Sequence, residues 1–194
     1  MKKGLLIVLS GPSGVGKGTV LKEFINDPDL KLSYSVSLTT RKMRPGEKDG
    51  VNYHFVSKEE FLKVRDAGGL LESAEFVGNY YGTPVAGVEE LRNKGRNVLL
   101  EIEVQGARQI RQKCPDALTI FIVPPSMEEL ERRIRGRGTE PEEIVQQRLA
   151  KASREMDMIG EYKYVVCNDD PRLAADIIRV IIKRHMEQGA CNSC

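Results

Sequence analysis

A glycine-rich segment near the start of the chain has the composition of a phosphate-binding loop. It reads Gly11-Pro12-Ser13-Gly14-Val15-Gly16-Lys17 and follows the apolar run Leu5 to Leu9. Glycines let the backbone curl so that successive N–H groups point inward and form a nest for an anion. A helix predicted from Lys17 to Ile25 would direct its positive end at the same point, and Lys17 adds a full positive charge. The spacing G-x-x-x-x-G-K between a strand and a helix therefore predicts a site for nucleotide phosphates.

The residue after Lys17 bears on how a magnesium ion would be held. Ser or Thr usually stands there, and its hydroxyl commonly binds Mg²⁺. This chain has Gly18 at that position, followed by Thr19. We therefore expect phosphate oxygens, water and other side chains to hold the ion, which suits Mg²⁺ because it usually keeps several waters.

A phosphate loop alone would fit a GTPase, an ATPase motor or a small-molecule kinase. The base-reading pattern N-K-x-D of GTPases is absent from the sequence. A kinase needs a second anion site for its acceptor. Arg41 and Arg44, in a polar loop, supply guanidinium groups that suit a phosphate monoester. The hydroxyls of Tyr53, Tyr80 and Tyr81 can also donate to such a group.

A second concentration of arginine lies further along the chain. Gly136 and Gly138 flank Arg137, which indicates a mobile lid of the kind that closes over a substrate. The arginines of this region are Arg132, Arg133, Arg135, Arg137, Arg148 and Arg154. Glutamates lie among them, so a pair of salt-bridged surface helices is the alternative interpretation. We expect about half of these arginines to serve only in that way.

The whole chain has the composition of an ordinary globular protein of one domain. It has 194 residues, 40% hydrophobic and 30% charged, and a net charge of +2 from 30 basic and 28 acidic residues. This balance argues against broad nucleic-acid binding, which needs a basic excess. The longest apolar run is far shorter than the about 20 residues that span a membrane, so we expect a cytoplasmic chain without a membrane partner. Cys191 and Cys194 lack a second ligand pair, and we expect that tail to be inert.

The elements that must position these residues alternate between strands and helices, which is the signature of an α/β sheet. Ser57 and Glu60 have the S-x-x-E spacing of a helix start, and the pairs at 126 and 129 and at 139 and 142 repeat that spacing. Strands are expected at 5–9, 34–40, 53–56, 70–77, 97–103, 118–123 and 163–167. Helices are expected at 17–25, 57–68, 85–94, 106–113, 126–136 and 139–158, and from 170 onward.

Several short motifs follow one another between Leu5 and about His185. They are the loop Gly11 to Thr19, Ser35-Val36-Ser37-Leu38-Thr39-Thr40-Arg41 with Arg44-Pro45-Gly46, Asn79-Tyr80-Tyr81-Gly82-Thr83, Glu101-Ile102-Glu103-Val104-Gln105-Gly106, Pro124-Pro125-Ser126, Arg135-Gly136-Arg137-Gly138-Thr139 and Asn168-Asp169-Asp170. In this order they resemble the guanylate kinases, which are nucleoside monophosphate kinases with a phosphate-binding loop. The resemblance is specific because so many motifs keep their order.

The resemblance implies transfer of the γ-phosphate of ATP to GMP, giving ADP and GDP in purine nucleotide metabolism, with Mg²⁺ accompanying ATP. It implies an α/β fold: a P-loop kinase core with a central, mostly parallel sheet flanked by helices, an inserted GMP-binding subdomain and a helical lid. We place the core at 1–33, 97–125 and 159–194, the GMP-binding region at 34–96 and the lid at 126–158. All three belong to one guanylate-kinase-like domain of about residues 4–185. Whether the chain forms a homo-oligomer is left open.

The resemblance also assigns roles to particular residues. The ATP-binding residues would be Gly11, Pro12, Ser13, Gly14, Val15, Gly16, Lys17, Gly18 and Thr19, with Asn168 on the adenine side. The guanine readers would be Ser37, Glu72 and Thr83, with Glu103 as a second contact to the base, and the clamp on the GMP phosphate would be Arg41, Arg44, Tyr53 and Tyr81. The catalytic cations would be Lys17, Arg41, Arg133, Arg137 and Arg148. Glu101 resembles the acid that orients Mg²⁺ through water.

The chemistry of guanine is consistent with these roles. Guanine offers N1–H and an exocyclic amine as donors and O6 as an acceptor. Glu72 can accept from both donors, and Thr83 can donate to O6. Adenine reverses the pattern, so a buried carboxylate would be left unpaired against AMP. The acceptor phosphate is already an anionic nucleophile, so we expect catalysis to come from positioning two polyanions and neutralising their repulsion.

Two alternatives remain open. The nearest alternative is another nucleoside monophosphate kinase, because adenylate kinases also have a Gly-Thr pair at the positions of Gly18 and Thr19. A protein-interaction scaffold is the other, since guanylate-kinase-like domains also serve in that way without activity. The scaffold is disfavoured because the chain keeps the Gly11 to Lys17 loop together with the acceptor arginines.

Overall fold

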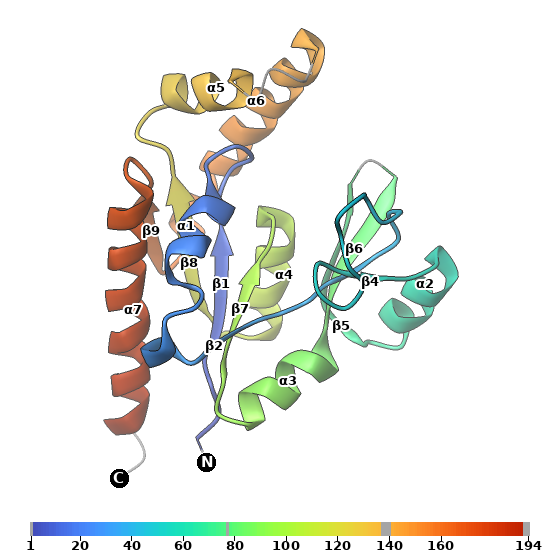
Figure 1. The fold of residues 1–194 in the computed structure, drawn as a ribbon, viewed down its shortest axis with the longest axis vertical. Coiled ribbons are helices and arrows are strands. Elements are labelled where there is room, and N and C mark those ends of the chain that lie inside the picture. The colour runs from blue at the N-terminus through green and yellow to red at the C-terminus, as the bar shows by residue number, and fades with distance from the viewer. Residues whose placement is uncertain (1, 77, 137–140, 192–194) are drawn as a thin grey trace.

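The computed structural model describes residues 2–76, 78–136 and 141–191, which fold around two β-sheets (Figure 1). The larger sheet has the strand order β2-β7-β1-β8-β9, and every neighbouring pair is parallel. Its strands are β1 (Leu6–Ser10), β2 (Leu32–Tyr34), β7 (Asn97–Glu101), β8 (Leu118–Val123) and β9 (Tyr164–Cys167). The predicted α/β fold with a central parallel sheet is confirmed.

Helices cover both faces of the larger sheet (Figure 1). They are α1 (Lys17–Phe24) and α7 (Pro171–Cys191) on one face and α3 (Val85–Asn93) and α4 (Val104–Lys113) on the other. Ile7 and Leu9 of β1 enter one apolar core, and Leu6 and Val8 enter the other, because successive strand side chains point to opposite faces. β1 is therefore packed on both sides, which fixes the start of the loop that follows it.

The smaller sheet carries the segment inserted between β2 and β7. Its strand order is β4-β3-β6-β5, with β5 antiparallel to β6. The bounds are β3 (Leu38–Thr39), β4 (His54–Phe55), β5 (Leu70–Phe76) and β6 (Asn79–Pro84), and α2 (Lys58–Asp66) follows β4. The predicted capping box at the start of α2 is present, since Ser57 Oγ accepts from Glu60 N and Glu60 Oε2 accepts from Ser57 N. It fixes where α2 begins.

Two further helices stand beyond the ends of β1 and β8 (Figure 1). They are α5 (Met127–Arg135) and α6 (Glu142–Met156). Ser126 caps α5 as its spacing predicts, because its hydroxyl accepts from Glu129 N. The predicted cap at Thr139 lies outside the described residues. α5 and α6 pack against each other, and each supplies one arginine, Arg133 and Arg148, that contacts the loop after β1.

Some predicted boundaries differ from the observed ones. The strand expected at 97–103 ends at Glu101, and the following helix begins at Val104 rather than 106, because Glu103 takes the extended conformation of an N-cap. The segment expected to be extended at 34–40 splits between two sheets: Tyr34 ends β2, and Leu38 begins β3. No strand was predicted at 79–84, where β6 forms by pairing with β5. The helix expected to reach 158 ends at Met156, and a 3-10 turn follows at Ile159–Glu161.

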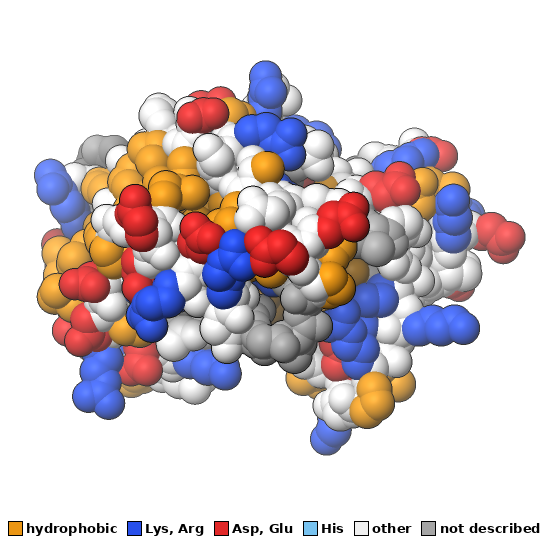
Figure 2. All heavy atoms as spheres, turned by 90° about the horizontal axis from the view of Figure 1, so that it is seen from above, with side chains coloured by type: hydrophobic (Ala, Val, Ile, Leu, Met, Phe, Trp, Pro, Cys, Tyr) orange, Lys and Arg blue, Asp and Glu red, His pale blue; other side chains and the backbone are white. Residues whose placement is uncertain are grey.

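The surface carries charges of both signs. On the face seen from above α5 and α6, Lys and Arg side chains alternate with Asp and Glu (Figure 2). Of the helices that the structure describes, none is long and apolar enough to cross a membrane. A second 3-10 turn, Pro28–Leu30, completes the described elements.

Candidate active site

The segment between β1 and α1 curls around the amine of Lys17. Gly14 and Gly16 have φ angles of 86° and 93°, a left-handed conformation that glycine adopts without strain. Lys17 Nζ donates to the carbonyl oxygen of Gly11 at 2.7 Å and to that of Pro12 at 3.2 Å. The loop is therefore a formed turn with a cation at its base, directly before the N-terminus of α1.

Two carboxylates face that cation. Burial lowers the pKa of Lys17, and the charges of Glu101 and Glu155 oppose this shift. Burial raises the pKa of Glu101, and Lys17 opposes that shift in turn. A Cβ on Gly18 would lie 3.9 Å from Glu101 Oε1. The carboxylate of Glu101 thus borders the position where related loops carry a hydroxyl.

Helix α6 reaches the loop through residues near its C-terminal end. The backbone N–H of Ser13 donates to Glu155 Oε2 at 3.2 Å, and Arg148 donates to Ser13 Oγ from Nε at 3.3 Å and from Nη2 at 3.0 Å. Lys151 Nζ lies 2.8 Å from Glu103 Oε2 and 3.8 Å from Glu155 Oε1. Glu155 is buried, and burial raises its pKa. One helix therefore contacts both the loop and the acid that follows β7.

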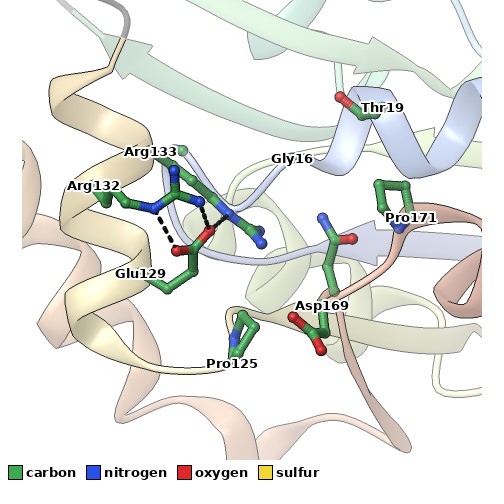
Figure 3. Close-up of a pocket in the computed structure, with 10 residues that line it drawn as sticks. Gly16, Thr19, Pro125, Glu129, Arg132, Arg133, Asp169 and Pro171 are labelled. Carbon is green, nitrogen blue, oxygen red and sulfur yellow. Dashed lines mark hydrogen bonds and ion pairs between the residues drawn. The ribbon is translucent and has the colours of Figure 1, made fainter.

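A cavity of about 610 Å³ opens on the other side of the loop (Figure 3). It is lined by Gly14, Gly16, Thr19, Pro125, Glu129, Arg132, Arg133, Asn168, Asp169 and Pro171. Asn168 Nδ2 donates to the carbonyl oxygen of Val15 at 2.7 Å. Asn168 Oδ1 is buried and has no hydrogen-bond partner within the described part of the chain. This oxygen can therefore accept a hydrogen bond from a ligand.

Among the arginines of α5, Arg133 contacts the loop, whereas Arg132 and Arg135 pair with glutamates. Arg133 Nε donates to Glu129 Oε1 at 2.7 Å, and its Nη1 donates to Val15 O at 3.3 Å, so this side chain reaches the loop (Figure 3). Arg132 also pairs with Glu129, whose pKa the two arginines hold at about 2. Arg135 pairs with the acids at 131 and 142 on the surface. The predicted lid residue Arg137 lies outside the described residues.

A separate cavity of about 340 Å³ lies between the two sheets. It is lined by Ser37, Arg41, Arg44, Glu47, Tyr53, Glu72, Ala74, Tyr81, Glu101, Ile102, Glu103 and Gly106. The structure thus brings together the residues predicted to bind the acceptor, although they come from loops and strands more than 60 positions apart. Thr83 does not line the cavity but contacts Glu72 behind it.

Arg41 is held in place by a carboxylate that the sequence analysis missed. Its Nη1 and Nη2 donate to Glu47 at 3.0 and 2.7 Å, and its guanidinium lies 5.4 Å from the centre of the Tyr53 ring. Arg41 lowers the pKa of Glu47 to about 2. The sequence did contain a hint of this ion pair, because Glu47 follows Arg41 by six residues in the same polar loop. A phosphate bound by Arg41 would compete with Glu47.

Glu72 is the buried carboxylate of this cavity. Only 5% of it is exposed, and Thr83 Oγ1 donates to its Oε1 at 2.7 Å. Burial raises the pKa of Glu72, and the bond from Thr83 opposes that shift. The contact follows from the pairing of β5 with β6, which places Glu72 opposite Thr83. It leaves Oε2 for another donor.

The acceptor cavity and the loop share a wall. Glu101, Ile102 and Glu103 line the cavity between the sheets and also a smaller one, of about 270 Å³, that contains Lys17 and Arg148. Two anions held at the loop and at Arg41 would therefore meet beside Glu101. A parallel sheet, a phosphate-type loop after its central strand, and a second cationic cavity that adjoins the loop define a P-loop phosphotransferase with a separate acceptor site.

Comparison with known proteins identifies the family. The family described as guanylate kinase matches residues 3–185. The guanylate kinase of Streptococcus pyogenes serotype M3 is 53% identical over 182 residues, which cover 94% of this chain and 86% of that protein. The crystal structure of guanylate kinase from Anaplasma phagocytophilum has a TM-score of 0.74 at 37% identity and covers 95% of this chain and 87% of its own.

The chain belongs to the guanylate kinase family. Its activity is ATP-dependent phosphorylation of GMP to GDP.

Proposed function

We propose that the γ-phosphoryl group passes from ATP directly to the phosphate of GMP, in line and without a phosphoenzyme. The observation that carries this proposal is the wall of Glu101, Ile102 and Glu103 shared by the acceptor cavity and the cavity at Lys17. Two bound nucleotides would meet there with no side chain needed as an intermediate carrier. The bond from the γ-phosphorus to the leaving oxygen of ADP breaks as a bond to a GMP phosphate oxygen forms.

The ATP side uses the loop Gly11 to Thr19. Its backbone N–H groups bind the phosphates, and Lys17 adds charge at the point where the helix α1 begins. Arg133 and Arg148, which contact the loop at Val15 and Ser13, neutralise the repulsion between the two polyanions. Arg137 is proposed to join them. The orphan Oδ1 of Asn168 would accept a hydrogen bond from the adenosine side.

In the acceptor cavity, hydrogen-bond acceptors and donors of the chain would recognise the guanine base. Glu72 accepts from N1–H and the exocyclic amine of guanine, while Ser37 supplies a hydroxyl and Glu103 a second carboxylate. Thr83, expected from the resemblance to contact the base itself, lies behind Glu72 and supports its carboxylate instead. AMP would leave the buried carboxylate of Glu72 without donors, a mismatch that typically costs about 10⁴-fold or more where a site reads polar groups. The phosphate of GMP is bound by residues that line the same cavity, namely Arg41, Arg44, Tyr53 and Tyr81.

The chain also fits a magnesium ion at the loop. Glu101 offers an oxygen ligand beside Gly18, where its carboxylate faces Lys17, and hard cations prefer such oxygens. Mg²⁺ would offset phosphate charge, and Glu101 would orient it through water. We further propose that residues 34–96 form the GMP-binding region, that residues 126–158 form the lid, and that the enzyme acts in the cytoplasm.

The test is ADP release with each of GMP, AMP, UMP and CMP as acceptor. We expect GMP alone to be used well. Glu72→Gln is expected to raise the KM for GMP by about 10- to 100-fold, the usual loss for one charge-assisted hydrogen bond. A strong preference for AMP would refute the substrate assignment. An unchanged KM for GMP in Glu72→Gln would remove Glu72 from the base site.

A further inference from the structure

Gly106 leaves open the space in which the Glu72 carboxylate lies. Gly106 is the third residue of α4 and is buried against β5. A Cβ placed on it would lie 2.5 Å from Glu72 Oε2 and 3.0 Å from Glu72 Cδ. Non-bonded carbon and oxygen atoms do not approach to 2.5 Å, so any other residue at 106 would displace this carboxylate.

β5 cannot move away to relieve such a contact, because α4 is bonded to it on both sides of Glu72. Gln109 accepts from Ser73 N at 3.1 Å and donates to Ser73 O at 2.8 Å. Lys113 Nζ donates to Leu70 O at 3.1 Å. Gly106, Gln109 and Lys113 are spaced at i, i+3 and i+7, which places them on one face of the helix. That face fixes the distance between α4 and the strand that carries Glu72.

The carboxylate is confined from the opposite direction as well. Thr83 Oγ1 holds Glu72 Oε1 at 2.7 Å, and Thr83 itself is fully buried on β6. One oxygen of Glu72 is therefore fixed by a hydroxyl, and the other lies against the bare backbone of Gly106. Such an arrangement leaves little freedom in the direction in which the carboxylate faces a ligand.

We propose that Gly106 is a positioning residue for base selection, in which the absence of a side chain sets the direction of the Glu72 carboxylate. The proposal rests on the proposed function, in which Glu72 accepts from two adjacent donors of guanine. The ligand class that this geometry selects is a purine monophosphate with an N–H and an amine side by side.

An added methyl group at 106 would act on recognition rather than on folding. The atoms that it meets all belong to the Glu72 side chain, so the contact would be relieved by turning the carboxylate away from Thr83 rather than by moving backbone. Alanine is also a better helix former than glycine, which offsets part of the cost of this displacement. The displaced carboxylate would no longer face both donors. Binding of the correct base weakens, whereas the loop and its cations are unaffected.

The experiment compares Gly106→Ala with Gly87→Ala. Gly87 is the third residue of α3, so the two glycines occupy the same helical position, but a Cβ on Gly87 meets no heavy atom of the described residues within 4 Å. The kinetic constants for GMP, for ATP and for inosine monophosphate, which lacks the exocyclic amine, are measured together with thermal unfolding. We expect Gly106→Ala to raise the KM for GMP by about tenfold or more and to narrow the preference for GMP over inosine monophosphate.

The other readouts separate positioning from a packing role. In Gly106→Ala, the KM for ATP, kcat at saturating GMP and the unfolding temperature should stay near those of the parent, and Gly87→Ala should match the parent throughout. The proposal is overturned if Gly106→Ala leaves the KM for GMP unchanged. It is also overturned if Gly106→Ala unfolds, or if its KM for ATP rises as much as its KM for GMP.

Glu72→Gln and the double variant distinguish this proposal from the one on which it rests. If Glu72→Gln raises the KM for GMP and the double variant raises it little further, Gly106 acts through Glu72. If Glu72→Gln raises the KM for GMP but Gly106→Ala alone does not, Glu72 keeps its role and the inference about Gly106 fails. If Glu72→Gln has no effect, the assignment of Glu72 fails, and the inference fails with it.

Discussion

Three carboxylates that border the acceptor cavity or the small cavity at Lys17 each form a hydrogen bond with another group of the chain. Glu47 pairs with Arg41, Glu72 with Thr83, and Glu155 with Ser13 N. In two of these pairs the partner is a group that we propose binds phosphate. In the proposed function, a nucleotide phosphate would compete at Arg41 and at Ser13 N with a carboxylate already in place. At Arg41, the carboxylate of Glu47 would offset the positive charge when no phosphate is bound.

Replacing Lys17 is expected to remove turnover. Lys17→Ala deletes the half-buried cation at the base of the loop, and loss of one preorganised group that stabilises transition-state charge typically costs about 10²–10³-fold in kcat. The measurement is steady-state ADP release with ATP and GMP. Lys22→Ala is the control, since Lys22 is an exposed cation on the same helix. Activity of Lys17→Ala near that of the parent would contradict the role given to the loop.

The raised pKa of Glu72 predicts how GMP recognition responds to pH. Only the ionised carboxylate accepts from both donors of guanine, so the KM for GMP should rise as the pH falls toward a pKa that lies above the ordinary value for Glu. Below that pKa the ionised fraction falls about tenfold per pH unit. The phosphate of GMP titrates as well, so the comparison is with Glu72→Gln, in which only the phosphate titrates. Identical pH profiles for the two proteins would exclude Glu72 as the titrating group.

At the scale of elements, the ends of strands and helices do most of the positioning. The loop follows β1, Glu101 ends β7, and Asn168 follows β9, so three parallel strands deliver groups to one edge of the larger sheet. Sequence predicted β1 and β7 because their apolar runs are continuous, as expected for strands buried on both faces. It also predicted β9, which lies at the edge of the sheet and is partly exposed. It did not predict β6, whose residues Asn79–Pro84 become a strand through pairing with β5. A strand defined by its partner carries a weaker local signal than one defined by burial.

The capping box of α2 offers a test confined to one element. Ser57→Ala removes the acceptor for Glu60 N, and loss of such a cap typically costs about 1 kcal/mol of unfolding free energy. The measurement is denaturant unfolding, with Ser153→Ala on the exposed face of α6 as a control expected to change stability by less than about 0.5 kcal/mol. Because α2 does not line the acceptor cavity, the KM for GMP should stay near that of the parent. Equal stability of the two variants would show that the cap does not limit stability.

At the scale of the whole molecule, the two proposed nucleotide sites lie on different units of structure. The acceptor cavity takes residues from the smaller sheet, whereas the larger cavity lies among the loop, α5 and the start of α7. Both adjoin β7 or the loop after β1, and α6 contacts the loop through Glu155 while Lys151 contacts Glu103. The two proposed ligand regions are thus joined by the larger sheet and by α6.

Each nucleotide is therefore expected to protect its own region. GMP at 100 times its Kd should raise the unfolding free energy by about 2.7 kcal/mol and slow amide exchange chiefly in β5 and β6. A non-hydrolysable ATP analogue at the same multiple should slow exchange chiefly in the loop 11–17 and α5. The measurement is amide hydrogen exchange followed by mass spectrometry. Protection of α5 by GMP, with β5 and β6 unaffected, would reverse the proposed assignment of the two cavities.

The sequence by itself determined what depends on near neighbours along the chain. The spacing of Gly11, Gly16 and Lys17, the caps at Ser57 and Ser126, and the buried strands all follow from rules that act within a few residues. Only the tertiary structure decided which distant groups touch. Ser13 and Glu155 are 142 positions apart, and Glu72 meets Gly106 across two different elements. Such contacts depend on how helices and sheets pack, because side-chain reach is a few ångströms and no local pattern records which elements will lie that close.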